Sequence, residues 1–386
     1  MVTTYIRRAY SSFVAHVFDI PARLLAFLLF LTLLFIPFAI QNTYYLRILI
    51  LANVLAIFAV SWDFLVGRTG QISLGHAIFF GIGGYITALL SSSKFFGLPI
   101  FLTIPIAILA ACIIALALGI PSLRVKGPYL ALVTMSFPLI LAALLKWYPL
   151  NHIFKGEFGI RGLPALVPRL DWMTIGQQRV GEYYVTLILL FAASVILYKI
   201  ANSKIGLVFV SILDDELASK ACGINVTKYK LMGFMISGLF GALAGCIQTH
   251  LLRFANPPMF ALTLSFLPVI VTFLGGLGTI YGPIVGAYIY YILDSYVLRD
   301  WLPRFLKETV GVTLPPEFDF AKLLIFTLIV LILVIKLPRG IAKFTTDKLG
   351  DLEEARDLDE RGPRIWKTYK KKEKTTSTGS EPTASS

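Results

Sequence analysis

The chain has 386 residues, of which 57% are hydrophobic and 15% charged, and its mean hydropathy is +0.77. This composition leaves too little polar surface to cover a soluble globule, so it predicts an all-α polytopic membrane protein. The net charge of +13 does not indicate nucleic acid as a partner, because the basic residues are scattered along the edges of apolar runs and no nucleic-acid-reading module is present. Attraction to anionic membrane lipid accounts for it.

About ten apolar runs are long enough to cross a hydrocarbon layer about 30 Å thick. They lie at residues 24–40, 46–66, 77–92, 100–120, 128–148, 182–200, 230–252, 263–280, 281–298 and 321–337. Glycine interrupts the third run and the pair within 263–298, so we expect half-helices or re-entrant turns there. No short apolar stretch with a cleavage site precedes the first run, which we expect to remain as a helix.

The distribution of lysine and arginine sets the expected orientation. An even number of spans puts both termini on one side of the cytoplasmic membrane, and the positive-inside rule makes that side the cytosol. Some basic residues lie at the opposite ends of the spans and are exceptions to the rule. These exceptions are Arg47, Lys94 and Arg253 in short loops, and Lys155, Arg161, Arg169 and Arg179 in the long loop 149–181.

A polar, glycine-rich stretch, GRTGQISLGH at 67–76, separates two of the apolar runs. Irregular backbone is tolerated at membrane depth only where protein or water satisfies its polar groups. One interpretation is a broken helix that lines a solute pathway, and the other is a cytosolic turn with packing glycines. The candidate pathway residues in this region are Thr69, Gly70, Gln71, Ser73, Gly75, His76, Gly81 and Gly84.

A charged segment at 201–230 interrupts the apolar runs, and a short helix is predicted at 214–223. Asp214 is placed to cap this helix, and Glu216 and Lys220 are spaced to form an ion pair one turn apart. Two interpretations are open: a cytosolic knob for a partner protein, or a solvated loop that happens to be helical.

Both ends of the helix predicted at 214–223 carry residues that favour a helix terminus. Asp215 and Glu216 complement the positive N-terminal end, and Gly223 can close the C-terminal end. Thr227 is then placed to cap the next span.

A second glycine-rich break, GGLGTIYGPIVG at 275–286, occupies a similar place in the second half of the chain. Gly-interrupted segments at corresponding places in two halves indicate a central pathway made by an internal repeat. Gly275, Gly276 and Gly278 are therefore further pathway candidates. Ser237, Gly241 and Gly245 form a small-residue seam, which is typical of helix packing.

The sequence shows no arrangement of residues that is typical of catalysis or of metal binding. The four histidines are dispersed, the three cysteines have no paired spacing, and no phosphate-binding GxxxxGK[ST] loop occurs. No acid lies at an expected bilayer midplane, which argues against proton coupling. Asp63 lies near a span end and is placed to pair with Arg68. We expect no catalytic residue, no metal and no bound cofactor.

Five fragments in order resemble the LivM-type permeases of branched-chain amino acid ABC importers. They are GRTGQISLGHAIFFGIGGY at 67–85, LRVKGPYLALVTMSF at 123–137, the block from 205 to 245, FLGGLGTIYGPIVGA at 273–287 and KLPRGI at 336–341. The resemblance covers roughly residues 45–341 and implies the ABC importer permease fold. The sequence departs from the family pattern at 156–164, in the loop that would face a binding protein.

The resemblance also implies partners. A permease of this type pairs with a second, homologous permease, two cytosolic ATPases that use ATP and magnesium, and an extracytoplasmic solute-binding protein. Residues 214–223 match the loop that contacts the ATPase. The candidate coupling residues are Asp214, Asp215, Glu216, Ala218, Lys220, Ala221 and Gly223.

The leading functional hypothesis is therefore a permease subunit for branched-chain or related small amino acids. A permease for urea or short amides and an ATP-independent channel or uniporter are the alternatives. The expected domains are a cytosolic N-terminus at 1–23, a permease domain at 24–341 with a cytosolic coupling segment at 201–229, and a largely disordered cytosolic tail at 342–386.

Overall fold

The structure is a computed structural model that describes residues 30–38, 42–122, 125, 128–169, 171, 173–301, 328, 332, 335–336 and 340–341. The expected N-terminal segment 1–23 and the tail 342–386 lie outside the described residues. So does most of the last expected span, 321–337.

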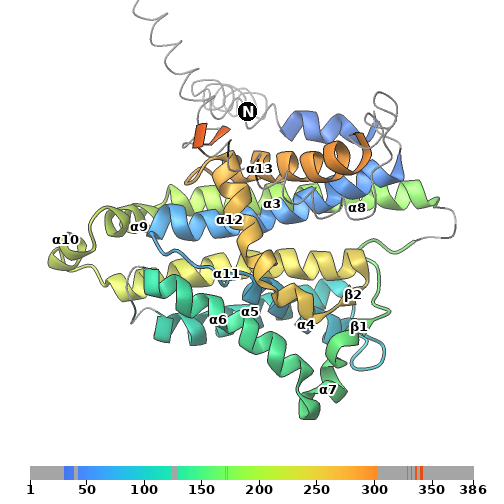
Figure 1. The fold of residues 1–386 in the computed structure, drawn as a ribbon, viewed down its shortest axis with the longest axis horizontal. Helices are drawn as coiled ribbons and strands as arrows, with labels where there is room; N and C mark the ends of the chain where they lie inside the picture. Colours follow the sequence, from blue (N-terminus) through green and yellow to red (C-terminus); the bar gives the residue numbers. More distant parts are fainter. Residues whose placement is uncertain are drawn as a thin grey trace, which may run out of the picture. The chain divides into compact units, whose positions relative to one another are not determined.

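The described residues are almost entirely helical (Figure 1). After a helical stretch at 30–38, the first half contains α3 (Thr43–Thr69), α4 (Ala77–Ser91), α5 (Ile100–Ser122), α6 (Pro128–Lys146), α7 (Tyr148–Phe154), the 3₁₀ turn η1 (Gly156–Phe158) and β1 (Ile160–Arg161). The second half contains α8 (Ile175–Ala201), α9 (Lys204–Asp214), α10 (Glu216–Ala221), α11 (Val226–Leu252), β2 (Phe254–Ala255), the 3₁₀ turn η2 (Pro257–Phe260), α12 (Leu262–Gly275), α13 (Tyr281–Tyr291) and the π-helix η3 (Ile292–Trp301).

Within the described residues, five helices are long and apolar enough to cross a membrane: α3, α5, α6, α8 and α11. The glycine-interrupted runs form shorter helices, with 15 residues in α4 and 14 in α12. At 1.5 Å per residue these span only about 21–23 Å, less than the hydrocarbon thickness. The chain is thus an all-α multi-pass membrane protein, but the expected count of about ten spans is not confirmed.

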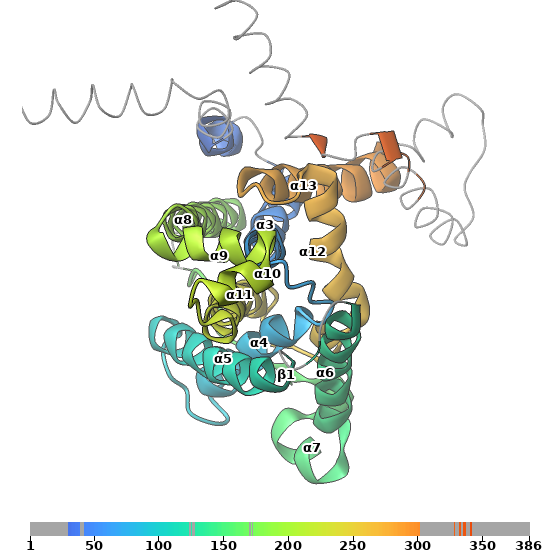
Figure 2. The ribbon, with the colours of Figure 1, turned by 90° about the vertical axis from the view of Figure 1, so that its left-hand side faces the viewer.

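Helix α3 is the central element of the described bundle (Figure 2). It packs against α8, α11, α12 and α13. In its most apolar stretch of 18 residues, 94% of the residues are buried, whereas the corresponding share in α5 is 22%. A helix that is apolar all round belongs in such a core. The outer helices instead expose large apolar side chains such as Phe101, Leu109 and Ile113 of α5. We interpret these faces as lipid-facing.

The α4–α11 interface confirms the packing role predicted for the small-residue seam. A Cβ atom at Gly83 would overlap the backbone of Ala242, and one at Gly245 would overlap the backbone of Phe80. Ser237 Oγ donates a hydrogen bond of 2.6 Å to the Ser61 carbonyl of α3. Small residues thus let three helix backbones approach closely.

Adding one methyl group to this interface should destabilise the protein. We expect Gly245→Ala to cost about 2 kcal/mol, because backbone atoms have no rotamer with which to make room. The melting temperature in detergent would measure the loss. Gly176→Ala is the matched control, since its Cβ would meet only Thr174 Oγ1, at 3.9 Å. Equal melting temperatures for the two variants would contradict the close packing.

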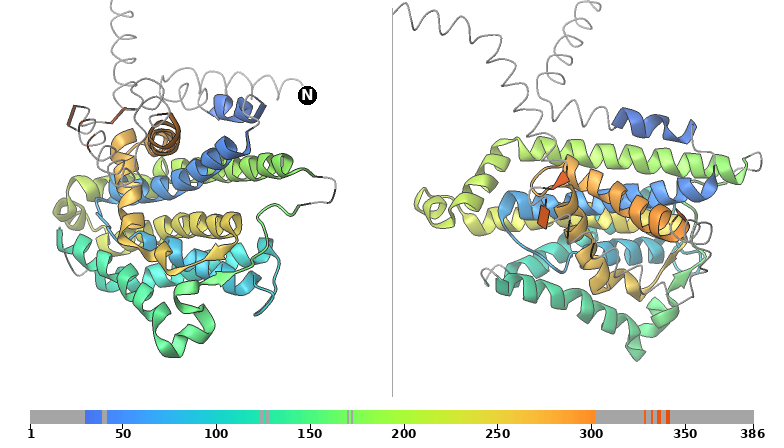
Figure 3. Two further views of the ribbon diagram at one scale, coloured as in Figure 1. Left: turned by 45° about the vertical axis from the view of Figure 1, so that its right-hand side comes forward. Right: turned by 45° about the horizontal axis from the view of Figure 1, so that its top comes forward.

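Helix α8 separates two loop regions at opposite ends of the bundle. Residues 202–225, with α10, lie at one end, and residues 148–174, with β1, lie at the other (Figures 1 and 3). We refer to these as the α10 end and the α7 end. This arrangement fits the prediction that the two segments face opposite sides of the membrane. Which of them faces the cytosol stays a prediction.

Candidate functional site

The helix predicted in the charged segment forms as α10, but its cap differs from the prediction. Asp215, not Asp214, caps it, and the Asp215 carboxylate accepts hydrogen bonds from the amides of Leu217 (2.8 Å) and Ala218 (3.0 Å). The prediction for Asp214 was wrong because a preceding helix, α9, runs through Asp214. Asp215 is therefore the residue with extended backbone, as an N-cap requires.

Gly223 closes α10 as its sequence position predicts. Its φ is +82°, its amide donates to the Lys220 carbonyl, and the Ile224 amide donates to the Ser219 carbonyl. These two bonds make a Schellman motif, which requires a left-handed residue. The prediction that Thr227 caps the next helix was wrong. Asn225 does so through Lys228 N, because α11 begins at Val226 and leaves Thr227 inside its first turn.

Glu216 lies between two lysines. Its carboxylate accepts hydrogen bonds from Lys220 Nζ (2.9 Å), as predicted, and from Lys230 Nζ of α11 (2.6 Å), which the sequence did not indicate. The bond from Lys230 and then that from Lys220 lower the pKa of Glu216 from 4.5 to about 2. Glu216 thus stays ionised and turned toward α11.

Apart from Lys220, which pairs with Glu216, the exposed residues of α10 are apolar or small. Leu217 is 73% exposed, and Ala218 and Ala221 beside it are exposed too. The buried side of the helix is fixed to α9, because Ser219 Oγ donates to the Ser211 carbonyl at 2.9 Å. The geometry therefore presents a small rigid knob with one large apolar side chain at its tip.

The α10 end contacts the first glycine-rich break directly. Lys230, which holds Glu216, also accepts a hydrogen bond of 2.9 Å at its carbonyl from Gln71 Nε2. The same Gln71 amide donates to Thr69 Oγ1 at 2.9 Å. Leu213 of α9 packs on Gly70, where an added Cβ would lie 2.9 Å from Leu213 Cδ1. Residues 69–71 thus lie between α9 and α11 and contact both helices.

The break itself, residues 70–76, is mostly buried rather than an exposed turn. Gln71, Ser73 and His76 are each at most 2% exposed, whereas Gly70 and Ile72 are exposed. Side chains of three helices bond to several of its polar groups, whereas Gln71 Oε1 and His76 Nδ1 have no hydrogen-bond partner among the described residues. The bonds are Trp62 Nε1 to the Ser73 carbonyl (2.7 Å), Leu74 N to Thr134 Oγ1 (3.2 Å), Ala77 N to Ser265 Oγ (3.2 Å), and His76 Nε2 with Ser61 Oγ (2.8 Å).

The second break lies against the first. Asp63 of α3 accepts a hydrogen bond of 2.7 Å from Gly278 N instead of forming the expected ion pair with Arg68. A Cβ atom at Gly67 would lie 2.6 Å from Gly278 Cα, so the two segments touch. Gly340, in the closing KLPRGI motif, packs on Gly276.

The remaining pathway candidates lie elsewhere. Gly75 packs against the backbone of Thr134 in α6, and Gly275 against α13. Gly81 and Gly84 pack against Phe260 and Met259 of η2. Gln71, Ser73, His76 and Gly278 therefore lie against the C-terminal half of α3, which ends at Thr69, while Gly81 and Gly84 occupy helix contacts farther along α4.

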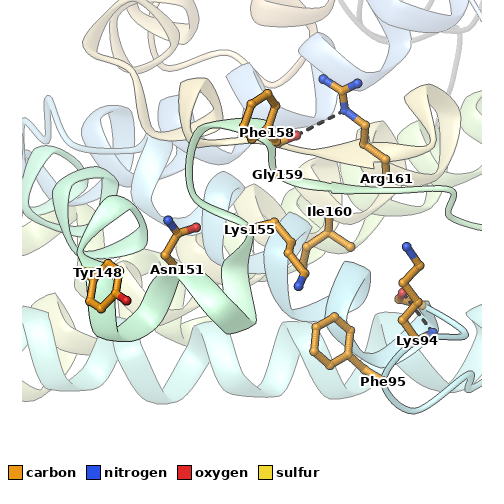
Figure 4. Close-up of a pocket in the computed structure, with 10 residues that line it drawn as sticks. Lys94, Phe95, Tyr148, Asn151, Lys155, Phe158, Gly159, Ile160 and Arg161 are labelled. Carbon is orange, nitrogen blue, oxygen red and sulfur yellow. Dashed lines mark hydrogen bonds between the residues drawn. The ribbon is translucent and has the colours of Figure 1, made fainter.

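At the α7 end, β1 pairs antiparallel with β2, in the register Ile160 to Ala255 and Arg161 to Phe254. Beside this ribbon is a hollow of about 480 Å³ (Figure 4). Its lining includes the cations Lys94, Lys155 and Arg161 and no carboxylate. We refer to it as the first hollow. Among the described residues, no group of three or more His, Cys, Asp or Glu side chains could hold a metal ion.

The profile of the family described as "Branched-chain amino acid transport system / permease component" matches residues 44–335. The chain belongs to this family. The matched region contains both breaks, α9 to α11 and the first hollow, whereas Gly340 lies outside it.

Individual relatives differ in the solutes that their names state. The chain is 28% identical over 275 residues to the high-affinity branched-chain amino acid transport system permease protein LivM of Escherichia coli, covering 65% of this chain and 63% of the relative. A probable branched-chain amino acid transport permease protein LivM of Methanocaldococcus jannaschii is 25% identical (68% and 77% covered). The ribose import permease protein RbsC of Haemophilus influenzae is 28% identical (67% and 77% covered). No solved structure matches the chain.

Three residues of this permease-family site were missed at the sequence level: Lys230, Leu213 and Leu217. Lys230 lies 14 residues from Glu216, beyond the spacing at which helical ion pairs are recognised. Leu213 and Leu217 are four residues apart, and the apolar pattern alone does not say which faces the bundle. The structure shows that Leu213 contacts Gly70 and that Leu217 points away.

Proposed function

We propose that this chain is the membrane-spanning subunit of an ATP-driven importer for branched-chain or related small amino acids. In this proposal it performs no chemistry on the solute and binds no cofactor. Two cytosolic ATPases carry ATP and magnesium, a second homologous permease completes the pathway, and an extracytoplasmic binding protein delivers the solute. Family membership and the LivM relatives support the solute class.

The observation that carries the proposal is that α9 and α11, the two helices that hold α10, both contact the first break. Leu217, flanked by small exposed residues, suits an apolar groove on an ATPase, and a buried aliphatic anchor is a common centre of binding energy. Movement of α10 then reaches the pathway by two contacts. One passes from Glu216 through Lys230 to Gln71, and the other from Leu213 to Gly70.

An external input is needed because alternating access must shift a population between two conformations. A nearly complete switch takes about 5.5 kcal/mol of differential free energy. The buried acids among the described residues are Asp63 and Glu182. Each has a partner, Gly278 N for Asp63 and Arg179 for Glu182.

Reconstitution tests the proposal. The purified chain alone in liposomes should move no leucine, and adding the second permease, the ATPases and the binding protein should give ATP-dependent uptake. Urea, acetamide and ribose serve as competing labelled solutes. Uptake of one of these in place of leucine would reassign the solute. Rapid ATP-independent flux through the chain alone would show a channel and refute the importer.

The proposed orientation places α10 and both termini in the cytosol. A cysteine of the native sequence can be used to test it. Cys222 follows α10 and is exposed, whereas Cys246 is buried. An impermeant thiol reagent applied to intact cells should therefore leave Cys222 unmodified until the membrane is permeabilised. In a Cys222→Ser background, Glu157→Cys at the α7 end should react in intact cells, because its side chain is 77% exposed. The opposite pattern would invert the topology.

A further inference from the structure

A second hollow lies at the α7 end, apart from the breaks and from α10. Its volume is about 450 Å³, within the range of small-molecule sites. It is lined by four arginines, Arg47, Arg169, Arg179 and Arg253, and by Ile175, Gln178, Glu182, Leu251 and Leu252. These residues come from the start of α3, the start of α8 with its preceding loop, and the end of α11.

The charge of this second hollow is not compensated by its own lining. Glu182 is 2% exposed and bonds to Arg179 at 2.6 Å. Arg169 donates to the Met173 carbonyl at 3.3 Å. The guanidinium groups of Arg47 and Arg253 form no hydrogen bond or ion pair with the residues that the structure describes, and both residues are exposed. Two guanidinium groups are therefore available to an anion.

The depth of these guanidinium groups in the membrane follows from helix length. Helices α3, α8 and α11 have 27 residues each. At 1.5 Å per residue they are about 40 Å long, which exceeds the hydrocarbon core and reaches into the headgroup layers. Arg47 and Arg179 lie one turn inside α3 and α8, and Arg253 directly follows α11. Helix length therefore predicts that they lie at the level of the lipid phosphates.

The hollow also has an apolar part of its lining, formed by Ile175, Leu251 and Leu252. Helices α8 and α11 each pack along α3 but make few contacts with one another. The outer face of α8 exposes Ile188 and Phe191, which we interpret as lipid-facing. By contrast, the first hollow is formed by the loop after α4, by α7 and by residues 155–161.

We propose that the second hollow binds the phosphate of an anionic phospholipid. Guanidinium groups match phosphate oxygens with paired hydrogen bonds, and Ile175, Leu251 and Leu252 contact the lipid where its acyl chains begin. This site also explains why these arginines depart from the positive-inside rule, since they occupy a specific anion site rather than a charge-sorting loop.

The test uses the full-length chain in a neutral detergent and native mass spectrometry of added phosphatidylglycerol. Phosphatidylcholine and inorganic phosphate serve as competitors. We expect saturable binding of phosphatidylglycerol that neither competitor displaces. In Arg47→Gln/Arg253→Gln the affinity should fall about thirtyfold, because two cations beside an anionic headgroup are lost. Lys94→Gln/Arg161→Gln, which removes the same charge from the first hollow, should bind as the wild type does.

A second pair of substitutions keeps the test valid if the glutamine variant fails to fold. Arg47→Lys/Arg253→Lys retains the charge and loses the paired geometry, so it should weaken binding by an intermediate factor. Three results would overturn the proposal. They are undiminished lipid binding in both double variants, equal displacement by inorganic phosphate, and protection of Ile175→Cys, which lines the hollow and leaves its arginines intact, from thiol labelling by the solute-binding protein but not by phosphatidylglycerol.

Discussion

Replacing Gly223 with proline should abolish solute transport by the assembled importer while the chain still folds and inserts. Gly223 has a φ of +82°, and its amide bonds to the Lys220 carbonyl. Proline has a φ near −65° and no amide hydrogen, so the Schellman motif that ends α10 cannot form. The cost of about 3 kcal/mol falls on a six-residue exposed helix, and α10 would no longer present Leu217 in a fixed direction.

The measurement is ATP-dependent uptake by the reconstituted complex, together with the amount of ATPase that copurifies. We expect at least about a hundredfold loss of uptake, which corresponds to that cost. Gly223→Asn is the matched control. Asparagine tolerates the left-handed region, and no atom lies within 4 Å of a Cβ at this position, so uptake should be nearly normal. Normal uptake by Gly223→Pro at normal abundance would exclude α10 as the ATPase contact.

The sequence could predict those features of this chain that depend on local signals. The short helix at 214–223, its closure by Gly223 and the Glu216–Lys220 pair all follow from spacing within one or two turns. The caps were misplaced by one or two residues, at Asp214 and Thr227, because neighbouring helices began and ended at positions that the apolar pattern does not fix.

Contacts between distant segments could not be predicted. Gln71 meets Lys230 across 159 positions and Asp63 meets Gly278 across 215. One sequence carries no signal for such pairs. The glycines did indicate where backbones come close, but they did not identify their partners: Gly67 contacts the second break, whereas Gly81 and Gly84 pack on η2. Composition therefore gave the broken segments, and only tertiary packing shows that they touch.

Replacing Gln71 with leucine should uncouple ATP hydrolysis from transport. The Gln71 amide joins the Lys230 carbonyl to Thr69 Oγ1, while its Oε1 has no hydrogen-bond partner among the described residues. Leucine has a similar size and removes only the donated bonds. Networks of this kind carry about 0.5–2 kcal/mol of coupling, so uptake per ATP hydrolysed should fall by about 2- to 30-fold.

Gln178→Leu is the control for this prediction. Gln178 is also a buried glutamine, and its amide donates to the Val167 carbonyl at the α7 end, far along the chain from α10. Both variants should lose similar stability, because each removes a buried hydrogen bond. Only Gln71→Leu should lower the ratio of uptake to hydrolysis. Combining it with Lys230→Met should add little further loss if the two side chains act in one connection. An additive loss, or an equal change in Gln178→Leu, would mean that Gln71 contributes to stability alone and that motion of α10 reaches the pathway through Leu213 and Gly70.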